Sequence, residues 1–172
     1  APCSFQVGPG DRIALLGGNG SGKTSLLRLI LGEALDCTGE LRRASGLEIS
    51  YVSQRSDHLS GSLADFAEAQ GIDRTQFFTV LRKLDFSRAL LERDAAGYSA
   101  GQKKKVLLAA SLCQCSHLYV WDEPLNYIDL FSRMQVEELI LEYQPTMLFV
   151  EHDRAFRERV ATGVVELFPR NP

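Results

Sequence analysis

The feature that most constrains the fold of this 172-residue chain is a glycine-rich turn between an apolar run and a helical pattern. Residues 17–24 fit the pattern G-x-x-x-x-G-K-[ST], and residues 13–16 before them are typical of a buried strand. Glycines let successive backbone N–H groups turn inward onto a phosphate. A helix expected over residues 23–31 adds free N–H groups and the positive end of its dipole. The segment therefore predicts a phosphate site.

Two side chains at the end of this turn suit a nucleotide that carries magnesium. The Lys23 ammonium can reach β- and γ-phosphate oxygens, and the Thr24 hydroxyl can ligate Mg²⁺. The residues expected to surround the phosphates are Gly17, Gly18, Asn19, Gly20, Ser21, Gly22, Lys23, Thr24 and Ser25.

The rest of the chain alternates short apolar runs with helical stretches, which predicts an α/β fold with a mostly parallel sheet. Further strands are expected at residues 118–121, 147–150 and 164–167, and weaker strand signals occur at 40–42 and 49–53. Residues 62–93 show helical periodicity in Leu63, Phe66, Ala67, Phe77, Val80, Leu81 and Leu84. With 45% hydrophobic and 24% charged residues, we expect one domain over residues 1–172 with a helical insert at 62–98.

Composition excludes little about partners. The net charge of −3 gives no overall reason to expect nucleic acid or an anionic membrane. No apolar run approaches the roughly 18 to 20 residues of a spanning helix, and no signal pattern opens the chain, so a cytoplasmic location is expected. The four cysteines have no C-x-x-C spacing and are interpreted as reduced, mostly buried thiols.

Two acids follow the apolar run at residues 118–121. Asp122 and Glu123 would lie at the carboxyl edge of the sheet, where open α/β sheets bind ligands. Successive strand side chains point to opposite faces, so the two carboxylates are expected to have different tasks. We expect Asp122 to hold Mg²⁺, usually through water, and Glu123 to polarise the attacking water.

A third segment predicts a second anion site. Small residues lead into a helix after Tyr98, with Ser99 as a candidate N-cap and free backbone N–H groups behind it. The run Y-S-A-G-Q over residues 98–102 resembles the L-S-G-G-Q signature of the ATP-binding cassette (ABC) family, with departures at Tyr98 and Ala100. This resemblance implies a P-loop NTPase domain that binds ATP and Mg²⁺, in which Ser99, Gly101 and Gln102 contact the ATP of another cassette.

Two single residues complete the ABC pattern. Gln54, after the strand at residues 49–53, is similar to the family's Q-loop glutamine, which contacts Mg²⁺ and water. His152, after the strand at 147–150, resembles the switch histidine that contacts the γ-phosphate. The resemblance therefore implies Glu123, His152 and Gln54 as catalytic residues, and Thr24, Gln54 and Asp122 as metal ligands.

The wording D-E-P-L-N-Y-I-D over residues 122–129 is similar to ABC-F proteins, in particular the subgroup associated with ribosome protection against antibiotics. The short stretch between Gln54 and Ser99 favours an ABC-F protein over a transporter. The resemblance implies the second cassette of a twin-cassette cytoplasmic ATPase that clamps the ribosome, with the other cassette in the same parent chain and no membrane partner. As an isolated fragment, the chain is expected to hydrolyse ATP weakly or not at all.

Some alternatives stay open. The chain could be the nucleotide-binding subunit of an ABC transporter, or a binding module whose ATP-bound form does the work. Residues 103–105, K-K-K, could contact RNA, form a solvated face or face the partner's nucleotide. The N-terminal β part is expected to be truncated, and Phe5 lies too close to the turn to stack on adenine. Loss of such a contact would cost about 1 to 3 kcal/mol in ATP affinity.

Overall fold

The computed structural model describes residues 3–55 and 59–168. Within them, β1 (Arg12–Leu16), β2 (Ile49–Val52), β3 (Leu118–Asp122), β4 (Met147–Val150) and β5 (Gly163–Glu166) form a sheet in the order β2-β3-β4-β1-β5. All four neighbouring pairs are parallel. The predicted α/β fold with a parallel sheet is confirmed, and each of these strands lies within about a residue of its predicted place.

The helices of the described residues are α1 (Lys23–Ile30), α2 (Leu63–Ala69), α3 (Arg74–Lys83), α4 (Arg88–Leu91), the 3₁₀ helix η1 (Ala95–Gly97), α5 (Ala100–Cys113), α6 (Leu130–Tyr143) and α7 (Arg154–Val160). All of them except α1 begin after a serine or aspartate whose side chain accepts a backbone N–H of the first turn. Helix α1 instead follows Gly22, which has no side chain to cap it. Its first N–H groups are therefore not satisfied by a side-chain cap.

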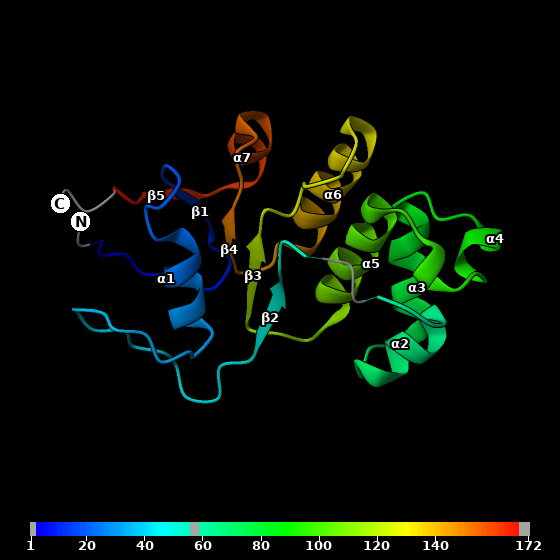
Figure 1. Cartoon of the computed structure of the whole chain (residues 1–172), viewed down its shortest axis with the longest axis horizontal. Coiled ribbons are helices and arrows are strands. Elements are labelled where there is room, and N and C mark those ends of the chain that lie inside the picture. Colours follow the sequence, from blue (N-terminus) through cyan, green and yellow to red (C-terminus); the bar gives the residue numbers. More distant parts are fainter. Residues whose placement is uncertain (1–2, 56–58, 169–172) are drawn as a thin grey trace.

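Helices cover both faces of the sheet (Figure 1). Leu15, Val120 and Leu148 point to the α1 face, where Leu27 and Ile30 of that helix join them in one core. The alternate strand residues Ala14, Trp121 and Phe149 belong to a larger core with α5, α6 and α7. This period of two explains why the strands are apolar throughout, since both of their faces are covered.

The predicted helical region lies beyond α5, away from the sheet (Figure 1). It contains α2, α3, α4 and η1, and α3 packs against α5. The predicted apolar face is buried at Leu63, Ala67, Phe77, Val80, Leu81 and Leu84, while Phe66 is partly buried against the same core. None of the helices in the described residues has both the length and the apolar character that crossing a bilayer requires.

The expected weak strand at residues 40–42 is wrong. This segment has no regular structure. Glu40 and Arg42 pair with each other across the surface, with 68% and 84% of their side chains exposed, and Leu41 is also exposed. Among the residues that the structure describes, no strand pairs with this segment, and strand propensity without packing partners does not form a strand.

The interpretation of the cysteines is partly wrong. All four are free thiols, as expected, but only Cys113 is buried. Cys3 and Cys37 lie in irregular segments outside the core, and Cys115 follows the end of α5 at the surface.

Candidate functional site

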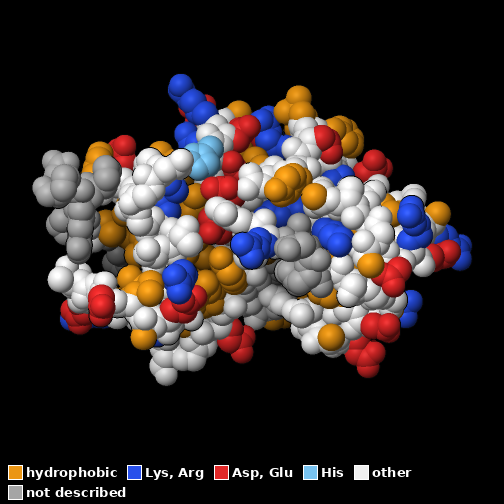
Figure 2. Space-filling model, viewed as in Figure 1, with side chains coloured by type: hydrophobic (Ala, Val, Ile, Leu, Met, Phe, Trp, Pro, Cys, Tyr) orange, Lys and Arg blue, Asp and Glu red, His pale blue; other side chains and the backbone are white. Residues whose placement is uncertain are grey.

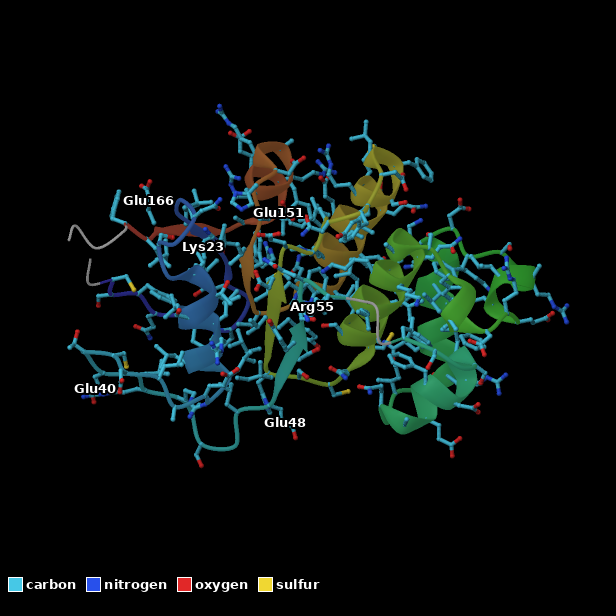
Figure 3. All side chains as sticks on the ribbon, in the orientation of Figure 1. Lys23, Glu40, Glu48, Arg55, Glu151 and Glu166 are labelled. Carbon is cyan, nitrogen blue, oxygen red and sulfur yellow. The ribbon has the colours of Figure 1, made fainter. Side chains whose placement is uncertain are left out.

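The candidate site lies at the carboxyl edge of the sheet. Val150 pairs with both Leu15 of β1 and Asp122 of β3, and Val52 pairs with Trp121, so four strands end side by side. Lys23 and Glu151 lie toward this end, whereas Glu40 and Glu48 lie toward the other (Figure 3). The sequence-predicted residues that follow β1, β2, β3 and β4 are therefore gathered at one edge.

The glycine-rich turn closes around the Lys23 side chain. Lys23 Nζ donates to the carbonyl oxygens of Gly17 at 2.7 Å and Gly18 at 3.1 Å. Gly17 and Gly22 have φ angles of +150° and +95°, and a Cβ on Gly17 would lie 2.5 Å from the Leu167 carbonyl oxygen. The residues of this segment that the structure places at the surface are Gly18, Asn19, Gly20, Thr24 and Ser25. The turn thus has the conformation and the lysine position that a phosphate cradle would need.

Asp122 brings a buried carboxylate to this edge. Only 3% of the residue is exposed, and its Oδ1 is buried without a hydrogen-bond partner. The Gln54 side chain acts to lower the pKa of the Asp122 carboxyl, so the structure brings these two predicted residues near each other. Burial, followed by the charge of Glu123, raises the pKa of Asp122, although Gln54, Lys104 and Lys23 act in the opposite direction.

The available oxygens fit a magnesium ion held together with a phosphate. No group of three or more His, Cys, Asp or Glu residues that could bind a metal occurs in residues 3–55 and 59–168. Mg²⁺ prefers oxygen ligands and is usually held by one or two carboxylates plus substrate phosphates and water. The unpartnered Asp122 Oδ1 and the exposed Thr24 fit that arrangement, and the buried Ser21 Oγ, also without a partner, adds an oxygen on the turn.

Glu123 leaves the strand in an unusual backbone conformation. Its φ is +48°, a region that costs a residue with a side chain about 1 to 3 kcal/mol. Asn126 Nδ2 donates to Glu123 Oε2 at 2.7 Å, and His152 Nε2 lies 3.7 Å from Oε1. The side chain is 24% exposed, which allows access to water. The structure therefore pairs Glu123 with His152, two residues predicted separately.

Glu151 is a residue of this edge that the sequence reasoning missed. It is 7% exposed, and its carboxylate accepts the backbone N–H groups of His152 at 2.6 Å, Asp153 at 3.1 Å and Leu125 at 3.1 Å. It therefore ties the loop after β3 to the loop after β4. Its place directly after a buried strand, like that of Asp122 and Glu123, is the signal that could have indicated it.

The segment before α5 forms a capping box. Gln102 N–H donates to Ser99 Oγ at 3.2 Å, and Ser99 N–H donates to Gln102 Oε1 at 3.0 Å, so Ser99 is the predicted N-cap. A Cβ on Gly101 would lie 2.5 Å from the Tyr127 carbonyl oxygen. A glycine is therefore needed at position 101 because the loop after β3 packs too closely for a larger residue.

These residues are not brought to the phosphate loop. Helix α5 covers the face of the sheet opposite to α1 (Figure 1). Within the described part of the chain, no hydrogen bond or ion pair joins Ser99, Gly101 or Gln102 to residues 17–24. The two segments that the sequence predicts to bind anions are therefore separate in the structure.

The three lysines at residues 103–105 do not form one solvated face. The alternative of a solvated face is wrong for Lys104, which is buried. Lys104 is 0% exposed, and its Nζ donates to the Ser53 carbonyl oxygen at 2.8 Å. Lys105 Nζ donates to the Leu84 carbonyl oxygen at 3.1 Å. Burial lowers the pKa of Lys104 to about 8, against the opposing effect of nearby carboxylates. Basic and acidic side chains are interspersed on the face shown in Figure 2, without one continuous basic surface.

The raised pKa of Asp122 leads to a stability prediction. A carboxyl group whose pKa is raised by folding stabilises the folded state below its ordinary pKa, and that contribution is lost as pH rises through the folded value. At pH 7 the buried charge is therefore a cost, and Asp122→Asn should raise the melting temperature (Tm) of the ligand-free chain by about 2 to 4 °C. Thermal unfolding across pH measures this.

The matched control for this prediction is Asp36→Asn, which changes an exposed aspartate. Its Tm should equal that of the wild type at each pH. An Asp122→Asn chain with an unchanged or lower Tm at pH 7 would contradict the burial argument.

Known proteins with similar sequences carry nucleotide-binding names. A family model described as "ABC transporter" matches residues 1–126. The ATP-binding protein Uup of Caulobacter vibrioides is 33% identical over 173 residues, covering 95% of this chain and 28% of Uup. The probable ATP-binding protein YheS of Escherichia coli is 32% identical over 153 residues, covering 85% of this chain and 24% of YheS. The chain thus spans about a quarter of the length of these relatives.

Solved structures share the fold. A complex of archaeal ribosomal stalk protein aP1 with ribosome recycling factor aABCE1 aligns with a TM-score of 0.76 at 22% identity, covering 95% of this chain and 35% of that chain. A putative metal-chelate type ABC transporter in an inward-facing conformation aligns with a TM-score of 0.75 at 25% identity, covering 95% and 71%. These two proteins differ in their described tasks, so the likeness shows the fold and does not choose between the tasks.

Proposed function

The chain belongs to the ABC transporter family and has the α/β fold of its nucleotide-binding domains, and on this basis we propose that it binds Mg-ATP and hydrolyses it to ADP and phosphate. The carboxyl edge of the sheet carries the proposal. There Asp122 holds an unpartnered buried oxygen, and Glu123 is turned toward His152 beside the cradle of Lys23. We assign residues 1–172 to one ABC ATPase domain with residues 62–98 as its helical insert.

Each residue of the proposed site has a task. The backbone of residues 17–22 and the Lys23 ammonium bind the phosphates. Thr24, Gln54 and Asp122 would hold Mg²⁺, which supplies positive charge to the phosphate oxygens when it is bound. Glu123 accepts a proton from the attacking water or orients that water, while His152 Nε2 lies 3.7 Å from its Oε1. Asn126, which donates to the second Glu123 oxygen, fixes the direction of that carboxylate.

The second anion-binding feature serves a partner in this proposal. Ser99 caps α5, and Gly101 and Gln102 lie in its first turn, on the sheet face opposite to α1. These three residues would contact ATP held by another cassette. Two such cassettes would therefore complete each other's sites, and efficient hydrolysis would need both. The geometry supports this arrangement, because within the described residues no hydrogen bond connects Ser99, Gly101 or Gln102 to residues 17–24 of the same chain.

We further propose that the parent protein is a twin-cassette ABC-F protein that acts as an ATP-dependent clamp on the ribosome in the cytoplasm, with a role in antibiotic resistance. Similarity to Uup and YheS, proteins of the ABC-F type, supports the subgroup. The sequence D-E-P-L-N-Y-I-D at residues 122–129 supports the subgroup associated with ribosome protection. The short coverage of the relatives fits one cassette of a longer chain.

Co-sedimentation with ribosomes tests this clamp function. The protein that carries this chain should sediment with ribosomes more strongly in a non-hydrolysable ATP analogue than in ADP. Lys23→Ala, which removes the phosphate-binding ammonium, should abolish the difference. Ribosome binding that does not depend on the nucleotide would contradict the clamp.

The alternative of a transporter subunit predicts a different partner. The family description and the metal-chelate transporter likeness favour this second candidate. In that case the chain should co-purify with a membrane-spanning partner in detergent, and ribosomes should not retain it in any nucleotide state.

A further inference from the structure

We propose that Lys104 is a positioning residue for hydrolysis, whose buried ammonium ties helix α5 to the backbone beside Gln54 and balances the acidic groups at the carboxyl edge of the sheet. The inference rests on the proposed ATPase function, because it concerns the same site. Lys104 is not assigned to a contact with ATP. It acts through Gln54 and Asp122.

The first observation is the hydrogen bond of the Lys104 ammonium. Lys104 is 0% exposed and lies near the start of α5, and its Nζ donates to the carbonyl oxygen of Ser53 at 2.8 Å. Ser53 directly precedes Gln54, and the Gln54 side chain is one of the groups that act to lower the pKa of Asp122, so it lies near that carboxyl. Lys104 therefore ties α5 to the backbone directly before Gln54, at the edge of the sheet that carries the carboxylate proposed for magnesium.

The second observation is the charge around the ammonium. The groups that favour its charged form are the carboxylates of Asp122, Glu123 and Glu151, which come from the ends of β3 and β4. A buried charge is costly unless it is paired and hydrogen-bonded, so the lysine and these acids stabilise one another. Lys23 also acts on Asp122, but its ammonium is held by the glycine-rich turn.

The third observation is the anchoring of α5. At its far end, Ser111 Oγ lies 2.7 Å from Ser50 Oγ of β2 and accepts the Trp121 Nε1 donor of β3 at 2.9 Å. At its near end, Lys104 holds the residues after β2, and Ser99 caps the helix. A displacement of Ser99 by a bound partner would therefore reach Gln54 through Lys104. In this way the signature segment would influence hydrolysis without touching the phosphate loop of its own chain.

The main experiment measures ATP turnover in the protein that carries this chain. Lys104→Met removes the charge and the donor but keeps a long apolar side chain. It should lower kcat about tenfold or more while KM for ATP changes less than about threefold, because the phosphate cradle is untouched. Lys104→Arg, which keeps the charge, should retain more activity than Lys104→Met. The matched control is Lys83→Met, which changes an exposed lysine paired with Glu142, and it should leave kcat and KM unchanged.

Two further variants separate charge from structure. Lys104→Gln keeps a donor toward the Ser53 oxygen without the charge, and wild-type kcat in this variant would overturn the charge-balancing role. Thermal unfolding of Lys104→Met alone and together with Glu123→Gln measures the coupling directly. Lys104→Met should lower Tm less in the Glu123→Gln background, since one of the acids that it balances is already neutral. An equal loss of Tm in both backgrounds would contradict the inference.

The same variants distinguish a failure of the proposed ATPase mechanism from a failure of the positioning role of Lys104. If Glu123→Gln leaves turnover unchanged, the proposed ATPase mechanism is wrong, whatever Lys104 does. If Glu123→Gln stops turnover while Lys104→Met keeps wild-type kcat and KM, the mechanism stands and the positioning role of Lys104 is wrong.

Discussion

Glu123→Gln should reduce ATP turnover by about a hundredfold or more while leaving the affinity for Mg-ATP nearly unchanged. The amide is the same size as the carboxylate but cannot accept a proton. Its neighbours Asn126 and His152 would remain in place, because only the charge and one acceptor are altered. Steady-state hydrolysis and equilibrium nucleotide binding in the protein that carries this chain measure the two quantities.

The control for this variant is Glu142→Gln. Glu142 is an exposed partner of Lys83 on α6, so its replacement should leave turnover at the wild-type level. Wild-type hydrolysis in Glu123→Gln would remove Glu123 from the catalytic role and would leave its left-handed backbone without a functional reason.

Gly101→Ala should destabilise the chain by about 1 to 3 kcal/mol and lower turnover at least about tenfold. In a helix, alanine is normally preferred over glycine. Here its Cβ would lie 2.5 Å from the Tyr127 carbonyl oxygen, so either α5 or the loop after β3 must move. That loop also contains Asn126, which orients Glu123, so the displacement reaches the hydrolysis site.

Gly97→Ala provides the matched control for Gly101→Ala. The nearest atom to a Cβ on Gly97 is Arg93 Nη2 at 3.8 Å, an ordinary contact. Its Tm and turnover should therefore match the wild type. Unchanged thermal unfolding of Gly101→Ala would show that the contact with Tyr127 relaxes without cost, and any loss of turnover would then arise from the signature segment alone.

The sequence predicted those parts of the site that depend on local pattern. The phosphate cradle is one continuous segment in which glycine, lysine and the helix start adjoin, so its shape follows from residues 17–24 alone. The gathering of Gln54, Asp122, Glu123 and His152 followed from a general property of parallel sheets, whose strands end at a common edge. The helix start at Ser99 likewise needed only its capping box.

Features that depend on distant contacts could not be predicted in this way. Lys104 belongs to a run of three lysines, which by composition favours a solvated face, and only the packing of α5 on β2 buries it. Gly101 is explained by a carbonyl oxygen of Tyr127, which no local pattern places there. Conversely, the run at residues 40–42 has some strand propensity but no neighbour to pair with, so the propensity has no effect.

The most direct test of the central claim, that this chain is an ATP-binding cassette whose phosphate site is built around Lys23, is a calorimetric titration of the chain with ATP in the presence of Mg²⁺. We predict saturable binding of one ATP per chain, weakened at least about tenfold in Lys23→Ala, because the ammonium that spans the Gly17 and Gly18 carbonyls would be lost. Binding of equal strength in the wild type and Lys23→Ala, or no binding to the wild type at all, would contradict the account.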